Sequence, residues 1–494
     1  MNRNYFLFIL FFLNFIKLNG VEIYPQNIFI DRYELIPPLG RIKSIGTSVN
    51  KIFALSDNYL LIFDKNNLEL IRTAYFNQDI FMLAYDQFYD ELWITSVNGL
   101  IRYNLHLGNI REYQFTEKVK SIGVGPDRIY ISAQHKFALE RLSGKLEVIS
   151  TFPENIKWYK GFDENELKKN KFLSPYYYLD DIRETNEPFY KYNITAFYDE
   201  GMYLYVGTDR YGLLKYNKIS RERRRIIYGP LSTAGQRLKK TGNRYYFISA
   251  YGISSYEAGA KKTWQYFRLK EQPNDMIFFN DELIASYGNQ LVKAIGNVTI
   301  PIVQFRNKVL NISFDEFNIY VGTDNGMYKI PKETNEPIAF GPDRYPVYII
   351  FSTHGQLFVG GEFATYRYDR EANKWFFVIN RGTKDICEIN NMLYFLTTDN
   401  QLIQYCSTND SSISKDDTLP IILPYFNIYD IDTDGKFLYC ATASGINYFD
   451  PEHQLYNPVY NLPRIKYNFV AVTDEDIIAV GDINIYRLAV QYRD

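Results

Sequence analysis

The chain repeats one stretch, ELWITSVNGLIRYN at residues 91–104, and this repeat decides the fold. Versions of it return as LYVGTDRYGLLKYN at 204–217, IYVGTDNGMYKI at 319–330 and LYCATASGINYFD at 438–450. Weaker copies align with these four, and the anchor residues of all eleven copies are Ala54, Ile94, Ile131, Val206, Ile248, Ile284, Val321, Val359, Leu396, Cys440 and Val480. Nine of the ten intervals lie between 36 and 44 residues, and the tenth is 75. A period near 40 residues indicates a structural repeat.

Each copy contains about four short apolar runs, at 81–85, 91–95, 100–103 and 110–115 in the clearest one. Asn98-Gly99 separates the second run from the third, and Asn and Gly accept the positive φ of a tight hairpin turn. The second run is almost continuously apolar, which favours a strand covered on both faces. We therefore expect an all-β protein whose repeat is a four-stranded antiparallel β-propeller blade.

Eleven or twelve blades are too many for one ring, because single propellers have about four to eight. The sequence therefore predicts two tandem propellers, at residues 21–270 and 271–494, with the break near Glu271–Asp275; the loop at 341–346 is the other plausible break. Residues 153–192 lie inside the long interval and form either an insertion or a degenerate blade. The run at 22–35 offers a strand that completes the final blade and removes its exposed edge.

The first twenty residues resemble a cleaved signal peptide. Arg3 precedes an apolar stretch from Tyr5 to Phe15, and Gly20 offers a small residue at the cleavage point. No later stretch is apolar enough to span a bilayer. We therefore expect a secreted or periplasmic protein with no stable membrane span after cleavage.

Composition argues against several classes of function. The 55 Lys and Arg residues against 57 Asp and Glu give a net charge of −2, which provides no electrostatic reason to bind nucleic acid. Three Cys and four His are too few and too scattered for a disulfide framework or a zinc site. Asp430-Ile431-Asp432-Thr433-Asp434-Gly435 has the alternating carboxylates of a calcium loop, but Ala441 occupies the twelfth position, which needs Glu. We expect no metal and no cofactor.

The strongest candidate binding site is the insertion at 153–192. It is rich in aromatic residues and lysines, and it emerges on the face of the second-to-third-strand turns, where it can cover a channel mouth. Exposed aromatic rings offer stacking surfaces to a sugar or an anchor to a protein partner. The alternative is that these aromatics form the core of a degenerate blade. The candidate residues are Trp158, Tyr159, Phe172, Tyr176, Tyr177 and Tyr178; the turn face adds Asn98, His135, Asp209, Arg210, Tyr211, Asp324, Asn325, Asp399 and Asn400.

Catalytic motifs are missing from the sequence. It contains no Gly-x-Ser-x-Gly, no His-Glu-x-x-His and no phosphate-binding Gly-rich loop. A propeller can nevertheless bring distant carboxylates together on its axis, and glycosidases need only two. The leading expectation is thus an exported, non-enzymatic protein that binds a protein or glycan through its loop faces, as a sensor or as a scaffold such as one for envelope assembly. The alternative is a carbohydrate-active hydrolase or lyase with axial carboxylates.

The repeat at 91–104 resembles that of the two-component-regulator propellers, Leu-Trp-Ile-Gly-Thr-x-x-Gly-Leu-x-Arg-Tyr-Asp. The best four copies match most motif positions, and the others match in hydrophobicity and turn placement. The resemblance implies a propeller fold and an extracytoplasmic recognition role of the sensor type. The transmembrane helix and kinase that usually follow such propellers are missing from this sequence.

Overall fold

The computed structural model describes residues 28–29, 33–141, 143–169, 193–233, 235–258, 264–269, 271–279, 282–295, 298–334, 336–341, 344–406, 418–421 and 427–491. Within these ranges the strands form eleven sheets of four or five strands, and neighbouring strands pair antiparallel. Each sheet follows one copy of the repeat. The prediction of an all-β fold built from four-stranded propeller blades is confirmed.

The first four sheets form one body, which we call the four-sheet body. Its elements are β3 (Ile42–Thr47), β4 (Lys51–Ser56), β5 (Tyr59–Asp64), β6 (Leu70–Tyr75); β7 (Ile80–Asp86), β8 (Glu91–Ser96), β9 (Gly99–Asn104), β10 (Ile110–Gln114); β11 (Ser121–Val124), β12 (Arg128–Ser132), β13 (Lys136–Glu140), β14 (Leu146–Val148), β15 (Lys157–Lys160), the helix α2 (Glu164–Lys169); and β16 (Ile194–Glu200), β17 (Tyr203–Thr208), β18 (Leu213–Asn217), β19 (Arg223–Ile226).

The other seven sheets form a second body, the seven-sheet body. Its elements are β20 (Gly235–Thr241), β21 (Arg244–Ser249), β22 (Gly252–Glu257), β23 (Trp264–Phe267); β24 (Asp275–Phe279), β25 (Glu282–Tyr287), β26 (Gln290–Ile295), β27 (Val298–Gln304); β28 (Val309–Phe314), β29 (Asn318–Thr323), β30 (Gly326–Pro331), β31 (Ile338–Ala339); β32 (Val347–Thr353), β33 (Gln356–Gly361), β34 (Thr365–Asp369), β35 (Lys374–Ile379); β36 (Thr383–Ile389), β37 (Met392–Thr397), β38 (Leu402–Cys406), β39 (Thr418–Ile421); β40 (Ile428–Thr433), β41 (Leu438–Thr442), β42 (Gly445–Asp450), β43 (Leu455–Pro458); and β44 (Tyr467–Val472), β45 (Asp476–Gly481), β46 (Ile485–Gln491) with β1 (Ile28–Phe29) and β2 (Glu34–Ile36).

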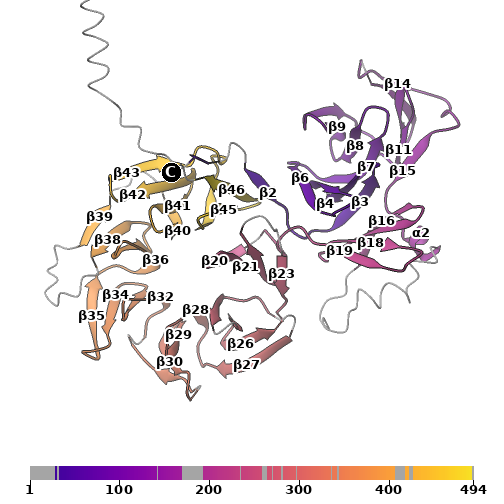
Figure 1. Cartoon of the computed structure of the whole chain (residues 1–494). Helices are drawn as coiled ribbons and strands as arrows, with labels where there is room; N and C mark the ends of the chain where they lie inside the picture. Colours follow the sequence, from indigo (N-terminus) through magenta and orange to yellow (C-terminus); the bar gives the residue numbers. More distant parts are fainter. Residues whose placement is uncertain are drawn as a thin grey trace, which may run out of the picture.

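The seven sheets are arranged radially around an axis lined by their first strands (Figure 1). The last inner strand, β44, packs against the first, β20, so this ring is closed. Leu238 and Phe247 share one buried cluster with Ala471 and Ile478. The predicted break at residue 271 would place β20–β23 with the amino-terminal sheets, whereas this packing joins them to the carboxy-terminal ones.

The sheet of β44–β46 is completed by the amino-terminal segment. β2 pairs with β46, with Glu34 opposite Arg487, and β1 continues the pairing at Ile28–Gln491. Arg487 also forms ion pairs with Glu34 (3.2 Å) and with the buried Asp476 (2.5 Å). Of the run predicted at 22–35 to complete the final blade, the described strands β1 and β2 lie at the outer edge of that sheet, where they cover an edge that would otherwise be exposed.

This arrangement makes the four-sheet body an insertion within the seven-sheet body, between its strands β2 and β20. The two connecting segments run side by side, and Leu39 N donates to Pro230 O (2.7 Å). Gly229 lies directly on Pro37, and a Cβ at position 229 would sit 1.6 Å from the Pro37 carbonyl oxygen. Tyr59 of β5 donates to Asn484 Oδ1 (2.6 Å) across the same junction.

In ten of the eleven sheets the second strand is buried along almost its whole length, as its apolar run predicts, whereas in β12 buried and half-buried residues alternate. In nine of the eleven sheets, the pairing of this strand with the inner strand shifts by one residue at a β-bulge. A bulge re-aims the side chain that follows it. In four sheets, the side chain of the residue directly after the bulge accepts a hydrogen bond from a backbone N–H of the inner strand of the next sheet. The pairs are Ser44 with Leu83 (3.1 Å), Asn311 with Ile350 (3.0 Å), Asp385 with Ile431 (3.3 Å) and Asp430 with Val470 (2.9 Å).

A buried ion pair joins the second and third sheets of the four-sheet body, and it generates the first prediction. Arg141 Nη2 lies 2.7 Å from Asp86 Oδ2, with both side chains at most 1 % exposed. Replacing Arg141 by Met leaves the Asp86 carboxylate buried and uncompensated, so we expect a loss of about 3–5 kcal/mol in urea unfolding. The control is Arg128→Met, which removes the exposed pair with Glu147 and should cost less than about 1 kcal/mol. Equal losses of stability in Arg141→Met and Arg128→Met would contradict the role given to the buried pair with Asp86.

The contact at Gly229 generates a second prediction. Gly229→Ala introduces a clash with backbone, which cannot rotate away, so the two connecting segments must separate. We expect faster proteolytic cleavage between residues 227 and 234 and a lower melting temperature. Gly235→Ala is the matched control, because its added Cβ would approach no atom closer than 3.8 Å. Indistinguishable digestion of the two variants would show that this packing is not needed.

Candidate functional site

The four-sheet body contains a cavity of about 350 Å³ near its axis. Its walls come from the inner strands β3, β7 and β16, and from β15 with the turn and helix α2 that follow it. Ile45, Leu83 and Ala196 provide apolar surface between the strands. The aromatic lining is Trp158, Tyr159, Phe162, Phe197 and Tyr198, and the charged lining is Lys43, Lys160, Asp163, Glu166 and Asp199.

The strand β15 accounts for part of the 75-residue interval. It pairs with β11 as a fifth, innermost strand, with Trp158 opposite Gly123 and Tyr159 opposite Ile122. Gly123 gives the indole ring room, since a Cβ there would lie 3.1 Å from it. Tyr159 is buried and donates to Tyr85 O (2.9 Å), which fixes β15 to β7. Residues 157–160 thus add a strand to an existing blade.

A lysine and two tyrosines connect the third sheet to the fourth at the cavity wall. Lys157 Nζ lies 3.3 Å from the Tyr198 hydroxyl and 5.0 Å from the centre of the Tyr159 ring. Burial alone would lower the pKa of Lys157, but its contacts with Tyr159 and Tyr198 outweigh burial and raise it. The ammonium group therefore stays charged and holds both phenol rings in place.

The cavity carries charges of both signs and an accessible aromatic ring. Asp199 is ion-paired with Lys218 at 2.6 Å. Phe162 is 37 % exposed and meets Phe197 edge to face, with ring centres 6.3 Å apart. Nearly balanced charges beside aromatic faces suit a polar ligand of low net charge better than a strongly charged one.

Of the predicted site residues, Trp158 and Tyr159 line this cavity. Phe172, Tyr176, Tyr177 and Tyr178 lie outside the described residues, so a role for them stays a prediction.

The residues predicted for the turn face are divided between the two bodies. Asn98 is exposed, and His135 is hydrogen-bonded to Glu117 (2.7 Å). The turn Asp209-Arg210-Tyr211 lies at the junction of the bodies, where Arg210 N donates to Gly40 O (3.2 Å). Asp324, Asn325, Asp399 and Asn400 belong to the seven-sheet body. These residues therefore do not form one continuous site.

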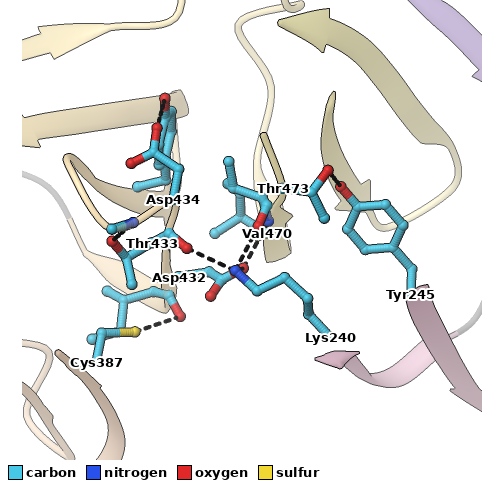
Figure 2. Close-up of polar contacts among 12 residues, drawn as sticks. Lys240, Tyr245, Cys387, Asp432, Thr433, Asp434, Val470 and Thr473 are labelled. Carbon is cyan, nitrogen blue, oxygen red and sulfur yellow. Dashed lines mark hydrogen bonds and ion pairs between the residues drawn. The ribbon is translucent and has the colours of Figure 1, made fainter. Parts of the chain in front are cut away.

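Sequence reasoning missed a charged cluster at the axis of the seven-sheet body. Asp275 of β24 is fully buried and pairs with Arg237 Nη1 (3.0 Å) and Lys239 Nζ (2.6 Å) of β20. Figure 2 shows the neighbouring Lys240, whose ammonium reaches Asp432 (3.0 Å) and the Thr433 carbonyl oxygen (2.7 Å) of β40. Tyr245 donates to Thr473 Oγ1 (2.9 Å) nearby. The Asp275 pairs tie the first sheet of the ring to the second, and the contacts of Lys240 and Tyr245 tie it to the last two.

Two further carboxyl groups lie on neighbouring inner strands: Asp385 of β36 accepts from Ile431 N (3.3 Å), and Asp430 of β40 accepts from Val470 N (2.9 Å). Burial raises the pKa of Asp385 to about 6, and burial together with the Asp385 charge raises the pKa of Asp430 well above its ordinary value. The sequence contained a sign of this role, because Asp385 and Asp430 align in the repeat with Ser44 and Asn311. All four residues directly follow the β-bulge of their inner strand. Within the described ranges, no group of three or more His, Cys, Asp or Glu residues is placed to hold a metal ion.

No family model and no curated protein sequence matches the chain. Among solved structures, the chain is similar to the extracellular domain of the hybrid two component system BT4673 from B. thetaiotaomicron, with 11 % identity, a TM-score of 0.40, and coverage of 92 % of this chain and 69 % of that one. It is also similar to PorZ, a surface component of the type-IX secretion system of Porphyromonas gingivalis, with 12 % identity, a TM-score of 0.33, and coverage of 90 % of this chain and 79 % of that one. The WD40 β-propeller domain of Doa1 matches with 10 % identity, a TM-score of 0.43, and coverage of 52 % and 93 %.

Proposed function

We propose that this protein is a non-enzymatic recognition protein that binds a glycan or a segment of a protein partner in the cavity of the four-sheet body. The observation that carries the proposal is the aromatic and charged lining of that cavity, built by β15 and α2 at the inner edge of the third sheet. About 350 Å³ is at the lower end of the range for small-ligand pockets. The site therefore suits one or two sugar rings, or a single side chain of a peptide.

The signal-like segment at residues 1–20 supports a location outside the cytoplasm for this binding. Among the described residues, none of the helices has the length and hydropathy of a membrane-spanning helix. A recognition protein at the cell surface or in the periplasm would meet glycans and peptides there.

The carboxyl pair on the other axis favours binding over hydrolysis. Glycosidases hold their two carboxyl groups about 5–5.5 Å apart when retaining and about 6.5–9.5 Å apart when inverting. Asp385 and Asp430 each accept a backbone N–H of the next inner strand, from Ile431 and from Val470, so both carboxyl groups are engaged in holding neighbouring blades together. The alternative, a hydrolase or lyase with axial carboxylates, would need a different pair.

The test is a screen of the full chain against glycan and peptide arrays, followed by calorimetric titration of the ligand found. Phe162→Ala removes an accessible ring from the cavity and should weaken binding about three- to tenfold. Phe317→Ala removes a 62 % exposed ring from a turn of the seven-sheet body and should leave binding unchanged.

Unchanged affinity in Phe162→Ala would place the ligand elsewhere. Release of reducing ends from a polysaccharide by the wild-type chain would overturn the non-enzymatic proposal and favour the hydrolase.

A further inference from the structure

One end of the four-sheet body, which we call the turn end, carries the turns between first and second strands and between third and fourth strands. These turns lie on the same side because the strands of each sheet alternate in direction. Lys65 after β5 pairs with Glu200 at the end of β16 (2.7 Å), and Arg72 of β6 donates to Leu105 O after β9 (3.1 Å). The buried ion pair between the second and third sheets lies at this end as well. The turns of all four sheets therefore share one surface.

Exposed apolar side chains gather in the turns of this end. Leu107, between β9 and β10, is 77 % exposed, and Ile219, between β18 and β19, is 78 % exposed. Clusters of exposed apolar side chains rimmed by polar groups mark interaction sites in soluble proteins. The large apolar residues exposed in these turns are Val49, Phe88, Tyr89, Leu107, Met202 and Ile219.

The turns themselves do not require apolar residues. Asn104 accepts the backbone N–H of Leu107, and Asp450 accepts that of His453 in the same kind of turn in the seven-sheet body. Among the described turns of these two kinds in the seven-sheet body, Phe317 is the exposed large apolar residue. The apolar turn end is thus a property of the four-sheet body, and it is not a consequence of the repeat.

The charged groups beside the apolar tips are paired with each other across the turn end. Such a surface has little net attraction for a strongly charged partner. Because the tips stand on separate turns, a protein partner would need a matching pocket for each of them, whereas a fluid lipid surface admits each tip independently. Zwitterionic headgroups match the balanced charges, and the acyl boundary accepts the apolar side chains. The pairs are Lys65–Glu200, Arg102–Glu91 and Lys218–Asp199.

We propose that the turn end of the four-sheet body docks on a zwitterionic lipid surface, with Leu107, Ile219 and the neighbouring tips inserted at the level of the headgroups. The binding energy comes from apolar area removed from water, so it depends little on salt. None of the six apolar residues lines the cavity described above, so docking goes beyond the proposed function and can be tested separately.

Co-sedimentation with phosphatidylcholine vesicles tests the docking. The chain is used as it stands after signal cleavage, from residue 21, because the apolar stretch before that point would itself enter vesicles. We expect the wild type to sediment with the vesicles, and to do so equally at about 0.05 M and about 0.5 M NaCl. The proposal fails if the chain stays in solution, or if it binds only anionic vesicles and is released by salt.

Substitutions at the tips test which surface binds. Leu107→Ser and Ile219→Ser should each weaken vesicle binding about three- to tenfold, and the losses should multiply in the double variant. Both side chains are exposed, so the melting temperature should stay that of the wild type. The matched control is Val97→Ser, which removes a 62 % exposed side chain from the opposite end of the same body. An equal loss of binding in Val97→Ser would refute the assignment to the turn end.

A fluorescent probe gives a local readout that does not depend on the affinity. In Leu107→Trp the added indole should be quenched by phosphatidylcholine brominated on its acyl chains, whereas in Val97→Trp it should not. The native tryptophans provide the same background in both variants. A vesicle-bound Leu107→Trp chain whose added indole is not quenched would show that another surface contacts the lipid, and would overturn the proposal.

Discussion

The inner strand of every blade is the edge of a sheet, and the protein must satisfy its unpaired backbone groups at the axis. A free N–H in such a place costs about as much as a lost hydrogen bond. The β-bulge near the start of the inner strand turns one side chain toward the next blade, and Ser, Asn or Asp at that position accepts the N–H. Four blades are tied to the next one in this way.

The residue type after the bulge decides whether the group that accepts the N–H can titrate. Ser44 and Asn311 provide acceptors that keep their charge state at all ordinary pH values, whereas Asp385 and Asp430 make the same contact with groups that titrate. Their environment decides the outcome: Asp275 is compensated by two cations, and its pKa is lowered despite burial. The same type of side chain therefore has a lowered pKa on β24 and a raised pKa on β36 and β40.

Sequence periodicity was sufficient to predict the fold, because a blade of about 40 residues leaves its mark in every copy. It also located Trp158 and Tyr159, since an excess of aromatics in the one irregular interval was visible without coordinates. The grouping of blades into rings was harder to predict, because the buried cluster that contains Leu238 and Ile478 brings together residues that no sequence spacing relates. The axial carboxyl pair was missed for a similar reason: Asp430 was considered as part of a calcium loop, although Asp430 and Asp432 are alternate residues of the inner strand β40.

The insertion of the four-sheet body between the strands β2 and β20 of the seven-sheet body has a consequence for biogenesis. Glu34 contacts Arg487, 453 residues further along the chain. During synthesis, this early segment must remain unpaired while the other strands of both bodies are made, because its partner strand β46 follows all of them in the chain. Contacts of such long range close slowly. An incomplete seventh sheet, with an open edge able to pair with other chains, is thus an unavoidable stage in the maturation of this protein.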